Sequence, residues 1–192
     1  MRSVPYVGRP GIPPAVAALV AAGRIRKTDR ILDVGCGTGT DALLLSAWGF
    51  RHVDAVDPDR AAIATARRRA TRRHLNHRVR FQVMPAEGLL AEFGPRRFDV
   101  VLHTLVANNL GRRKDEHFRN VAAVLRADGL LVLHERLGRG WANVPPGRVA
   151  PLAAVRRHFE LAPGVTTHLA EGLSSGPGHA VVALWLGRPR PN

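Results

Sequence analysis

Two features of the sequence predict an α/β fold. The first is the stretch Ile31–Gly39 (ILDVGCGTG), in which a short apolar run leads into three glycines at alternate positions. Residues 41–48 are then apolar at helical spacing and stop before Gly49, so a strand, a tight turn and a helix follow one another. Backbone amides and a helix N-terminus would face a ligand there, as in nucleotide sites. The second feature is the alternation of short apolar runs with helical stretches along the rest of the chain.

The same patterns predict the remaining elements. Helices are expected at 15–22, 41–48, 60–73, 116–127 and 152–159. Strands are expected at 31–34, 53–56, 79–83, 98–102 and 130–133, and two final strands near 165–168 and 180–186 form a hairpin. Residues 1–14 contain four prolines and two glycines and are expected to be irregular.

Length and composition indicate one domain. The 192 residues are enough to bury a sizeable core, and we expect an N-terminal cap with a helix at 1–29 and a domain at 30–188. Cys36 is the one cysteine, so an internal disulfide is impossible, which favours a cytoplasmic location. The longest nearly apolar run, 13–22, is shorter than the about 20 residues of a membrane span. We therefore expect no membrane partner.

The charge of the chain is strongly positive. Its formal net charge is +14 with a pI of about 11.7, and 27 of the 29 basic residues are arginines. Seven arginines lie between Arg67 and Arg80, a stretch without Asp or Glu. Such a field favours anionic partners such as nucleic acid. No aromatic residue interleaves with these arginines to stack on bases, so a compositional bias towards arginine stays an open alternative.

A carboxylate follows the glycine turn at a defined spacing. Asp57 ends the second apolar run, eighteen residues after Gly39. In nucleotide-binding folds an acid about 20 residues beyond the glycines holds a ribose diol. The dinucleotide fingerprint G-x-G-x-x-G would need a third glycine where this chain has Thr40, so a dinucleotide site is disfavoured.

The turn, with Asp33 before its G-x-G-x-G, resembles motif I of the class I S-adenosylmethionine (SAM) dependent methyltransferases. FDVVLHTLVANNL (98–110) resembles the family's fourth strand and loop, and VAAVLRADGLLVLHE (121–135) its next helix, turn and fifth strand. The match covers roughly residues 28–136. It implies a three-layer α/β/α sandwich around a mostly parallel seven-stranded sheet with a reversed C-terminal strand. It also implies SAM as cofactor and S-adenosylhomocysteine as product.

The resemblance assigns cofactor-binding positions. These are Asp33, Gly35, Cys36, Gly37, Thr38, Gly39, Asp57, Pro58, Ala86, Glu87, His103 and Asn108. One position departs from the pattern, because Pro85 stands where the family usually has an aspartate that binds the adenine amine. The backbone amide of Ala86 and the side chain of Glu87 are the expected substitutes.

Three polar residues at expected strand ends are candidates for catalysis: His103, His134 and Glu135. A general base is needed only if the acceptor keeps its proton at neutral pH, and histidine titrates in that range. Magnesium-dependent relatives carry several acidic ligands there, whereas only Glu135 fits, so no metal is expected.

Three functions follow from these residues. The first is methyl transfer to a small-molecule S, O or N nucleophile, with a loose likeness to the thiol- and metalloid-type branch. The second is an RNA methyltransferase that uses Arg67–Arg80 as a phosphate track. The chain lacks an Asp/Asn-Pro-Pro-aromatic box after the fourth strand and a cysteine there, which disfavours the known base-methylating classes. The third is a SAM-binding protein without catalysis. The oligomeric state is not predicted.

Overall fold

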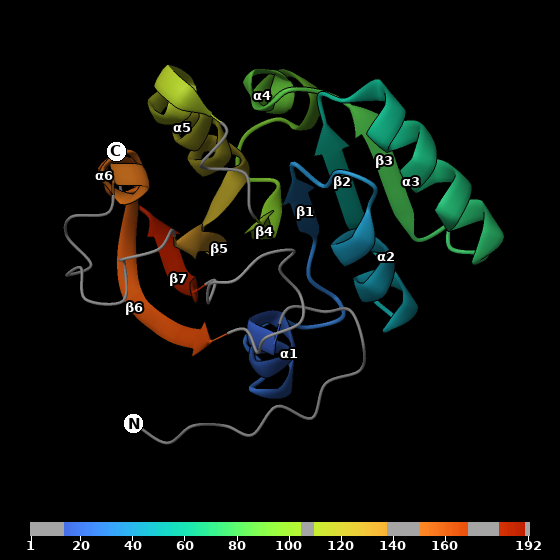
Figure 1. Cartoon of the computed structure of the whole chain (residues 1–192), viewed down its shortest axis with the longest axis horizontal. Coiled ribbons are helices and arrows are strands. Elements are labelled where there is room, and N and C mark those ends of the chain that lie inside the picture. Colours follow the sequence, from blue (N-terminus) through green and yellow to red (C-terminus); the bar gives the residue numbers. More distant parts are fainter. Residues whose placement is uncertain (1–13, 105–109, 138–149, 169–180, 191–192) are drawn as a thin grey trace, which may run out of the picture.

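The computed structural model describes residues 14–104, 110–137, 150–168 and 181–190. Its strands form one sheet in the order β3-β2-β1-β4-β5-β7-β6, with helices on both faces (Figure 1). Strands β1 to β5 pair in parallel, whereas β7 runs antiparallel to β5 and β6. The predicted α/β architecture with a mostly parallel sheet is confirmed.

Strands and helices alternate up to β5. The strands are β1 (Ile31–Val34), β2 (Val53–Asp57), β3 (Val79–Val83), β4 (Phe98–Thr104), β5 (Leu125–Leu137), β6 (Phe159–His168) and β7 (Val181–Pro189). The helices are α1 (Pro14–Ala21), α2 (Thr40–Ala47), α3 (Arg60–Arg72), α4 (Leu89–Phe93), α5 (Lys114–Val124) and α6 (Ala150–His158). Two 3₁₀ turns, η1 (Ala86–Gly88) and η3 (Gly111–Arg113), precede α4 and α5.

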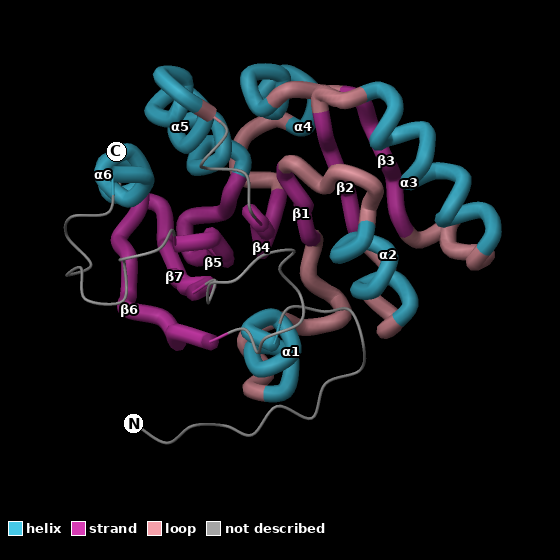
Figure 2. The backbone as a smooth tube through the Cα atoms, viewed as in Figure 1, coloured by secondary structure: helices cyan, strands magenta, loops and turns pink. Residues whose placement is uncertain are grey.

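Two apolar cores lie on opposite faces of the sheet. On one face, α1, α2 and α3 contribute Leu19, Leu43 and Ile63 to a core that includes Ile31 and Val100 of the sheet. On the other face, η1, α4, α5 and α6 cover a second core, with these buried members: Leu32, Val101, Leu89, Phe118 and Val155. Successive residues of β1 and β4 thus point into different cores, as the alternation of a strand requires. Figure 2 shows the strands running between the helices of the two faces.

The parallel strands give the sheet two distinct edges. The residues at and just before the starts of β1 to β4 form what we call the amino edge, and those at and just after the ends of β1, β2, β4 and β5 form the carboxyl edge. The register aligns the strands, since Ile31 pairs with Val53 and Val100, and Val53 pairs with Val79. Ligands of open parallel sheets bind at the carboxyl edge.

Several predicted boundaries were wrong. The helix expected to reach residue 127 ends at Val124, and β5 already begins at Leu125, which is buried and pairs with Phe98. The turn expected at Asp128-Gly129 lies inside β5, next to an irregularity in the pairing with β4. Strand β4 runs two residues further than expected, to Thr104. The short helix α4 was not predicted, because five residues carry too little periodicity.

The described helices are short, and the longest of them, α3, has 13 residues. Among the described residues, none of the helices combines the length and apolar character that crossing a bilayer requires.

Candidate functional site

The glycine turn folds back on the end of β2. Gly35, Gly37 and Gly39 all have positive φ angles, 73°, 52° and 79°. The N–H groups of Gly35 and Cys36 donate to the carbonyl of Val56 at 2.8 and 3.1 Å. These bonds hold the turn at the carboxyl edge, directly beside the end of β2.

Gly39 and Gly37 have different roles in the turn. A Cβ at Gly39 would lie 2.6 Å from the ring of Phe81 and 3.0 Å from Ala66, so this glycine lets the turn pack against α3 and β3. A Cβ at Gly37 would have no atom of the described residues within 4 Å. Gly37 therefore borders open space, where a ligand can approach the bare backbone.

Asp57 meets the turn, as the spacing of the two suggested. Its Oδ2 accepts the N–H of Gly37 at 2.8 Å, and its Oδ1 accepts the N–H of Asp59 at 2.8 Å. Asp59 in turn caps α3, because its carboxylate accepts the N–H groups of Ala61 and Ala62. Pro58 lies exposed between the two acids. The carboxylate of Asp57 is only half-buried, and each of its oxygens keeps acceptor capacity for a ligand.

Two further carboxylates stand behind the turn. Asp33 is 2% exposed, and within the described part of the chain its Oδ2 has no hydrogen-bond partner. Burial, reinforced by the negative charge of Asp41, raises the pKa of Asp33. Burial also raises the pKa of Asp41, and a hydrogen bond with Thr104 opposes that rise. A cation nearby would stabilise the ionised carboxylates of Asp33 and Asp41. This edge is therefore suited to a positively charged group.

Asp41 was not among the site residues predicted from the sequence, whereas Thr104 was expected near the cofactor. Asp41 lies in the first turn of α2, and Thr104 is the last residue of β4, which was expected to end at Leu102. An acid in the first turn of the helix that follows a glycine turn is the signal that could have identified Asp41.

Cys36 and Thr38 complete the turn. Burial raises the pKa of the Cys36 thiol, with a contribution from Asp33, so the thiol stays protonated and is a poor nucleophile. Thr38 is exposed, and its carbonyl and hydroxyl accept hydrogen bonds from Arg69 of α3 at 2.8 and 3.0 Å.

The residues expected beside the adenine follow β3. Met84 donates its N–H to the carbonyl of Asp57 at 3.0 Å, which brings the segment next to the end of β2. Pro85 has an extended backbone and precedes η1, in which Ala86 is 5% exposed. Glu87 is exposed, and its carboxylate lies 3.7 Å from the guanidinium of Arg113.

The expectation that His103 faces a ligand at the strand end was wrong. His103 has no exposed surface, and its Nε2 lies 2.9 Å from Nε2 of His117 in α5. The cause is strand alternation, because His103 shares the face of Val101 beneath α5, whereas Thr104 points towards Asp41. Burial and the neighbouring His103 lower the pKa of His117 to about 3, so this ring is neutral at pH 7.

His134, Glu135 and Asn108 stay predictions. The backbone of His134 pairs with Thr104 of β4, and that of Glu135 pairs with Ala183 of β7, so both residues lie at the carboxyl end of β5. The side chains of His134 and Glu135, and all of Asn108, lie outside the described residues. Within the described ranges, no group of three or more His, Cys, Asp or Glu side chains could hold a metal ion.

Three of the seven arginines between Arg67 and Arg80 bind to different parts of the fold. Arg67 donates two hydrogen bonds to the carbonyl of Phe81, at 2.7 and 3.1 Å. Arg69 binds the glycine turn at the carboxyl edge, as described above. Arg80 instead pairs with Asp54 at 2.7 Å, at the amino edge. These three side chains are therefore divided between the carbonyl of Phe81 in β3, the carboxyl edge and the amino edge.

Comparison with known proteins identifies the family. A family model described as a methyltransferase domain matches residues 31–129. An uncharacterized protein of Haemophilus influenzae is 30% identical over 132 residues, which are 66% of this chain and 50% of that protein. A ribosomal protein L11 methyltransferase of Pelobacter propionicus is 32% identical over 58% of this chain and 35% of its own length. The chain thus spans half or less of these relatives.

A solved structure extends the likeness to most of the chain. The description of that structure is the conversion of a disulfide bond into a thioacetal group during echinomycin biosynthesis. The two chains superpose with a TM-score of 0.71 and are 27% identical. The alignment covers 92% of this chain and 81% of that one. With a family model that matches more than half of its residues, the chain belongs to the methyltransferase-domain family, among the class I SAM-dependent methyltransferases.

Proposed function

We propose that the protein transfers a methyl group from SAM, by in-line displacement, to a small-molecule nucleophile with a sulfur, oxygen or nitrogen acceptor. One observation carries the proposal: the 2.8 Å hydrogen bond between the N–H of Gly37 and Oδ2 of Asp57. It joins the glycine turn and the acid at the carboxyl edge, where this family's cofactor would be held.

The residues present fit SAM. Gly37 borders open space, Asp57 keeps acceptor capacity for two ribose hydroxyls, and Oδ2 of Asp33 is buried without a partner among the described residues. The proposed cofactor residues are Asp33, Gly35, Cys36, Gly37, Thr38, Gly39, Asp57, Pro58, Ala86, Glu87 and Asn108. His103 is left out because its side chain is fully buried beneath α5.

The charge of the carboxyl edge suits this cofactor. When bound, SAM supplies a methyl group that its sulfonium already activates, along with an ammonium group. Asp33 and Asp41 can stabilise positive charge, since burial makes the ionised form of each unfavourable and the charge of Asp41 adds to this effect at Asp33. The protein's contribution is therefore to place the donor and to balance its charge, while the turn keeps the backbone accessible.

Proton removal from the acceptor is assigned to the end of β5. His134 and Glu135 follow Leu133, whose partner in β4 is His103, so their backbone lies at the edge that carries the turn. We assign them to positioning and deprotonating an acceptor with a high pKa. A thiol acceptor would need neither group.

The small-molecule acceptor is supported by a solved structure that this chain resembles over most of its length. The echinomycin structure, whose description is the conversion of a disulfide bond into a thioacetal group during echinomycin biosynthesis, is matched over 81% of its length. The ribosomal protein methyltransferase is matched over 35% of its length. The small-molecule acceptor is also favoured because Arg67, Arg69 and Arg80 bind at three different places and not along one line at this edge.

Cofactor placement can be tested by calorimetry with a ligand–variant cycle. Asp57→Ala should weaken S-adenosylhomocysteine binding by about 1.5–3 kcal/mol, because it removes charge-assisted hydrogen bonds to the ribose. Asp57 also anchors Gly37, so the 2′-deoxy form of the ligand is measured on both proteins. The losses of binding free energy caused by the variant and by the deoxy ligand should not be additive. Additive losses would mean that Asp57 acts only on the turn.

The acceptor class is tested by transfer of a labelled methyl group from SAM to a panel of thiols, phenols and amines. Turnover of one small-molecule class supports the proposal, and His134→Ala and Glu135→Gln should then slow phenols more than thiols. Binding of SAM without turnover of the panel, of protein or of RNA would indicate a SAM-binding protein without catalysis.

A further inference from the structure

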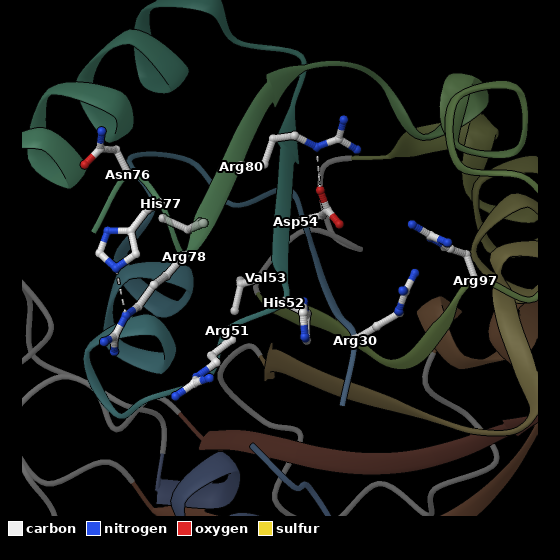
Figure 3. A pocket seen from close by; sticks show the side chains of 11 residues that line it. Arg30, Arg51, His52, Val53, Asp54, Asn76, His77, Arg78, Arg80 and Arg97 are labelled. Carbon is white, nitrogen blue, oxygen red and sulfur yellow. Dashed lines mark hydrogen bonds and ion pairs between the residues drawn. The ribbon is translucent and has the colours of Figure 1, made fainter. Parts of the chain in front are cut away.

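The amino edge carries a cationic cavity that methyl transfer does not use. It has a volume of about 240 Å³ and lies at the starts of β1 to β4. Arg30, His52, Arg78 and Arg97 each directly precede one of these four strands, and Arg51 lies one residue earlier. Figure 3 shows Arg30 and Arg97 on one side of the cavity, with Arg51 and Arg78 on the other.

Most of this charge is not neutralised. The nearby acids are already paired: Asp54 and Glu92 with Arg80, Asp99 with Arg126, and Asp29 with Arg26. Among the described residues, no carboxylate lies within 4 Å of the guanidinium groups that remain, which belong to Arg30, Arg51, Arg78 and Arg97. A concentration of like charge in a cleft attracts anions.

The cationic surface is extended. A second cavity of about 530 Å³ shares Arg51, His52 and Arg78 with the first and continues to Lys27. Four neighbouring strands at about 4.8 Å spacing span about 14 Å. A ligand that uses all of these cations must itself be long and regularly charged, which a single small anion is not.

We propose that the amino edge binds the phosphodiester backbone of a nucleic acid without reading its bases. Guanidinium groups match phosphate with paired hydrogen bonds. Among the described residues, no Phe, Tyr or Trp lines either cavity, so these residues offer no surface on which bases could stack. Phosphate contacts alone fix position and carry no sequence information.

The bound nucleic acid is a tether and not the methyl acceptor. Strand β1 has 4 residues, so the glycine turn and Arg30 lie at opposite ends of a strand about 13 Å long. The methyl donor and the phosphates therefore approach opposite edges of the sheet. This function goes beyond small-molecule methyl transfer, since it localises the enzyme and leaves its chemistry unchanged.

The test is fluorescence anisotropy with a labelled 20-nucleotide oligo(U) RNA at 50–200 mM NaCl. Four phosphate contacts predict a slope of log K against log salt of about −2.8, which is an about 50-fold loss across this range. Arg51→Gln combined with Arg97→Gln should reduce the slope to about −1.4 and the affinity at 100 mM about 25-fold. Both side chains are exposed and make no side-chain bond in the described structure.

The matched control is Arg60→Gln combined with Arg112→Gln, which removes the same charge from exposed residues next to the carboxyl edge. Its RNA affinity should fall less than threefold. An equal loss in both double variants, or a larger loss in the control, would overturn the location. Calorimetry with S-adenosylhomocysteine should give the same affinity for the Arg51/Arg97 variant as for the unmodified protein. A failure of the RNA-binding proposal can therefore be distinguished from a failure of the proposed cofactor binding.

Further arms identify the chemistry of the ligand. DNA of the same length should bind within about threefold of RNA, because each offers the same backbone charge. Polyglutamate of equal charge should compete at least tenfold more weakly, and inorganic phosphate should compete only above 10 mM, an expectation from its single charged group. Strong competition by polyglutamate would indicate an acidic protein partner and overturn the proposal, as would the absence of saturable RNA binding at 50 mM salt.

Discussion

The two edges of the sheet differ in the sign of their charge and in its burial. At the carboxyl edge, Asp33 and Asp41 are buried or half-buried behind the glycine turn. At the amino edge, Arg51 and Arg97 are exposed. The protein therefore has a net charge of +14 and nevertheless contains an acidic site. Overall charge says little about which ligand a particular edge accepts.

The difference also concerns the energetic cost of each edge. A buried carboxylate destabilises the fold unless a ligand or proton compensates it. An exposed arginine costs almost nothing, and its attraction for anions acts over about 10 Å at moderate salt. Removing a buried carboxylate at the carboxyl edge should therefore change both the free energy of unfolding and the affinity for a ligand. Removing an exposed arginine at the amino edge should change the affinity alone.

The largest effect is expected at the glycine turn. Gly39→Ala should lower the free energy of unfolding by about 2–5 kcal/mol, because its Cβ would meet Phe81 at 2.6 Å and an L-residue is strained at a φ of 79°. Urea unfolding measures this loss.

Gly37→Ala is the matched control. It has the same backbone strain without a clash, so it should cost only about 1–2 kcal/mol of stability. It should nevertheless weaken S-adenosylhomocysteine binding at least tenfold, because Gly37 borders the open space proposed for the cofactor. Equal stability losses in the two variants would contradict the division of roles between these glycines.

The next effect is a pH dependence of stability that arises from His117 of α5, which lies beside His103 of β4. The pKa of His117, about 3 in the folded protein, lies below the about 6.5 of an unfolded histidine. Between these values the unfolded chain binds more protons, so stability is full above pH 6.5 and falls on acidification. Between pH 8 and pH 5 the loss should be about 2 kcal/mol.

His117→Phe should remove this contribution, and urea unfolding at several pH values should show a flatter profile in the variant. Parallel profiles for the two proteins would mean that protonation of His117 is not linked to folding.

Asp33→Asn should separate stability from binding. Burial and the charge of Asp41 raise the pKa of Asp33, so ionised Asp33 destabilises the folded protein progressively as the pH rises. The neutral amide should gain stability on the order of 1 kcal/mol at pH 8 and less at pH 5. Its affinity for SAM should fall, and calorimetry at pH 8 would show both changes. A variant that is less stable at pH 8 would contradict the cost assigned to this carboxylate.

The sequence predicted the parts of the site that depend on local pattern. The apolar run, the glycines and the distance to Asp57 are fixed by chain order, and the hydrogen bond between Gly37 and Asp57 agrees with them. The orientation of His103 could not be predicted, because it depends on which residues of β4 are covered by α5. The β4 boundary depended on pairing with β5 in the same way.

The amino-edge cavity was missed for a different reason. Arg30, Arg51, Arg78 and Arg97 are far apart in the sequence and become neighbours only through the strand order. The densest run of arginines in the sequence lies between Arg67 and Arg80, and Arg67, Arg69 and Arg80 of that run bind to different parts of the fold. Local density of charge was therefore a poorer guide to a cationic surface than the position directly before each strand.

The smallest effect is expected at the amino edge and makes the comparison quantitative. Arg51→Gln combined with Arg97→Gln should change the free energy of unfolding by less than about 0.5 kcal/mol, because exposed side chains without partners contribute little. Arg67→Gln should cost about 1 kcal/mol, since it removes the hydrogen bonds to the carbonyl of Phe81 at 2.7 and 3.1 Å. Urea unfolding of the three proteins in the same buffer measures both. If the Arg51/Arg97 variant loses as much as Arg67→Gln, the amino edge supports the fold and its charge is not reserved for a ligand. If the free energy of unfolding of the Arg51/Arg97 variant is unchanged, stability does not explain why those charges lie together.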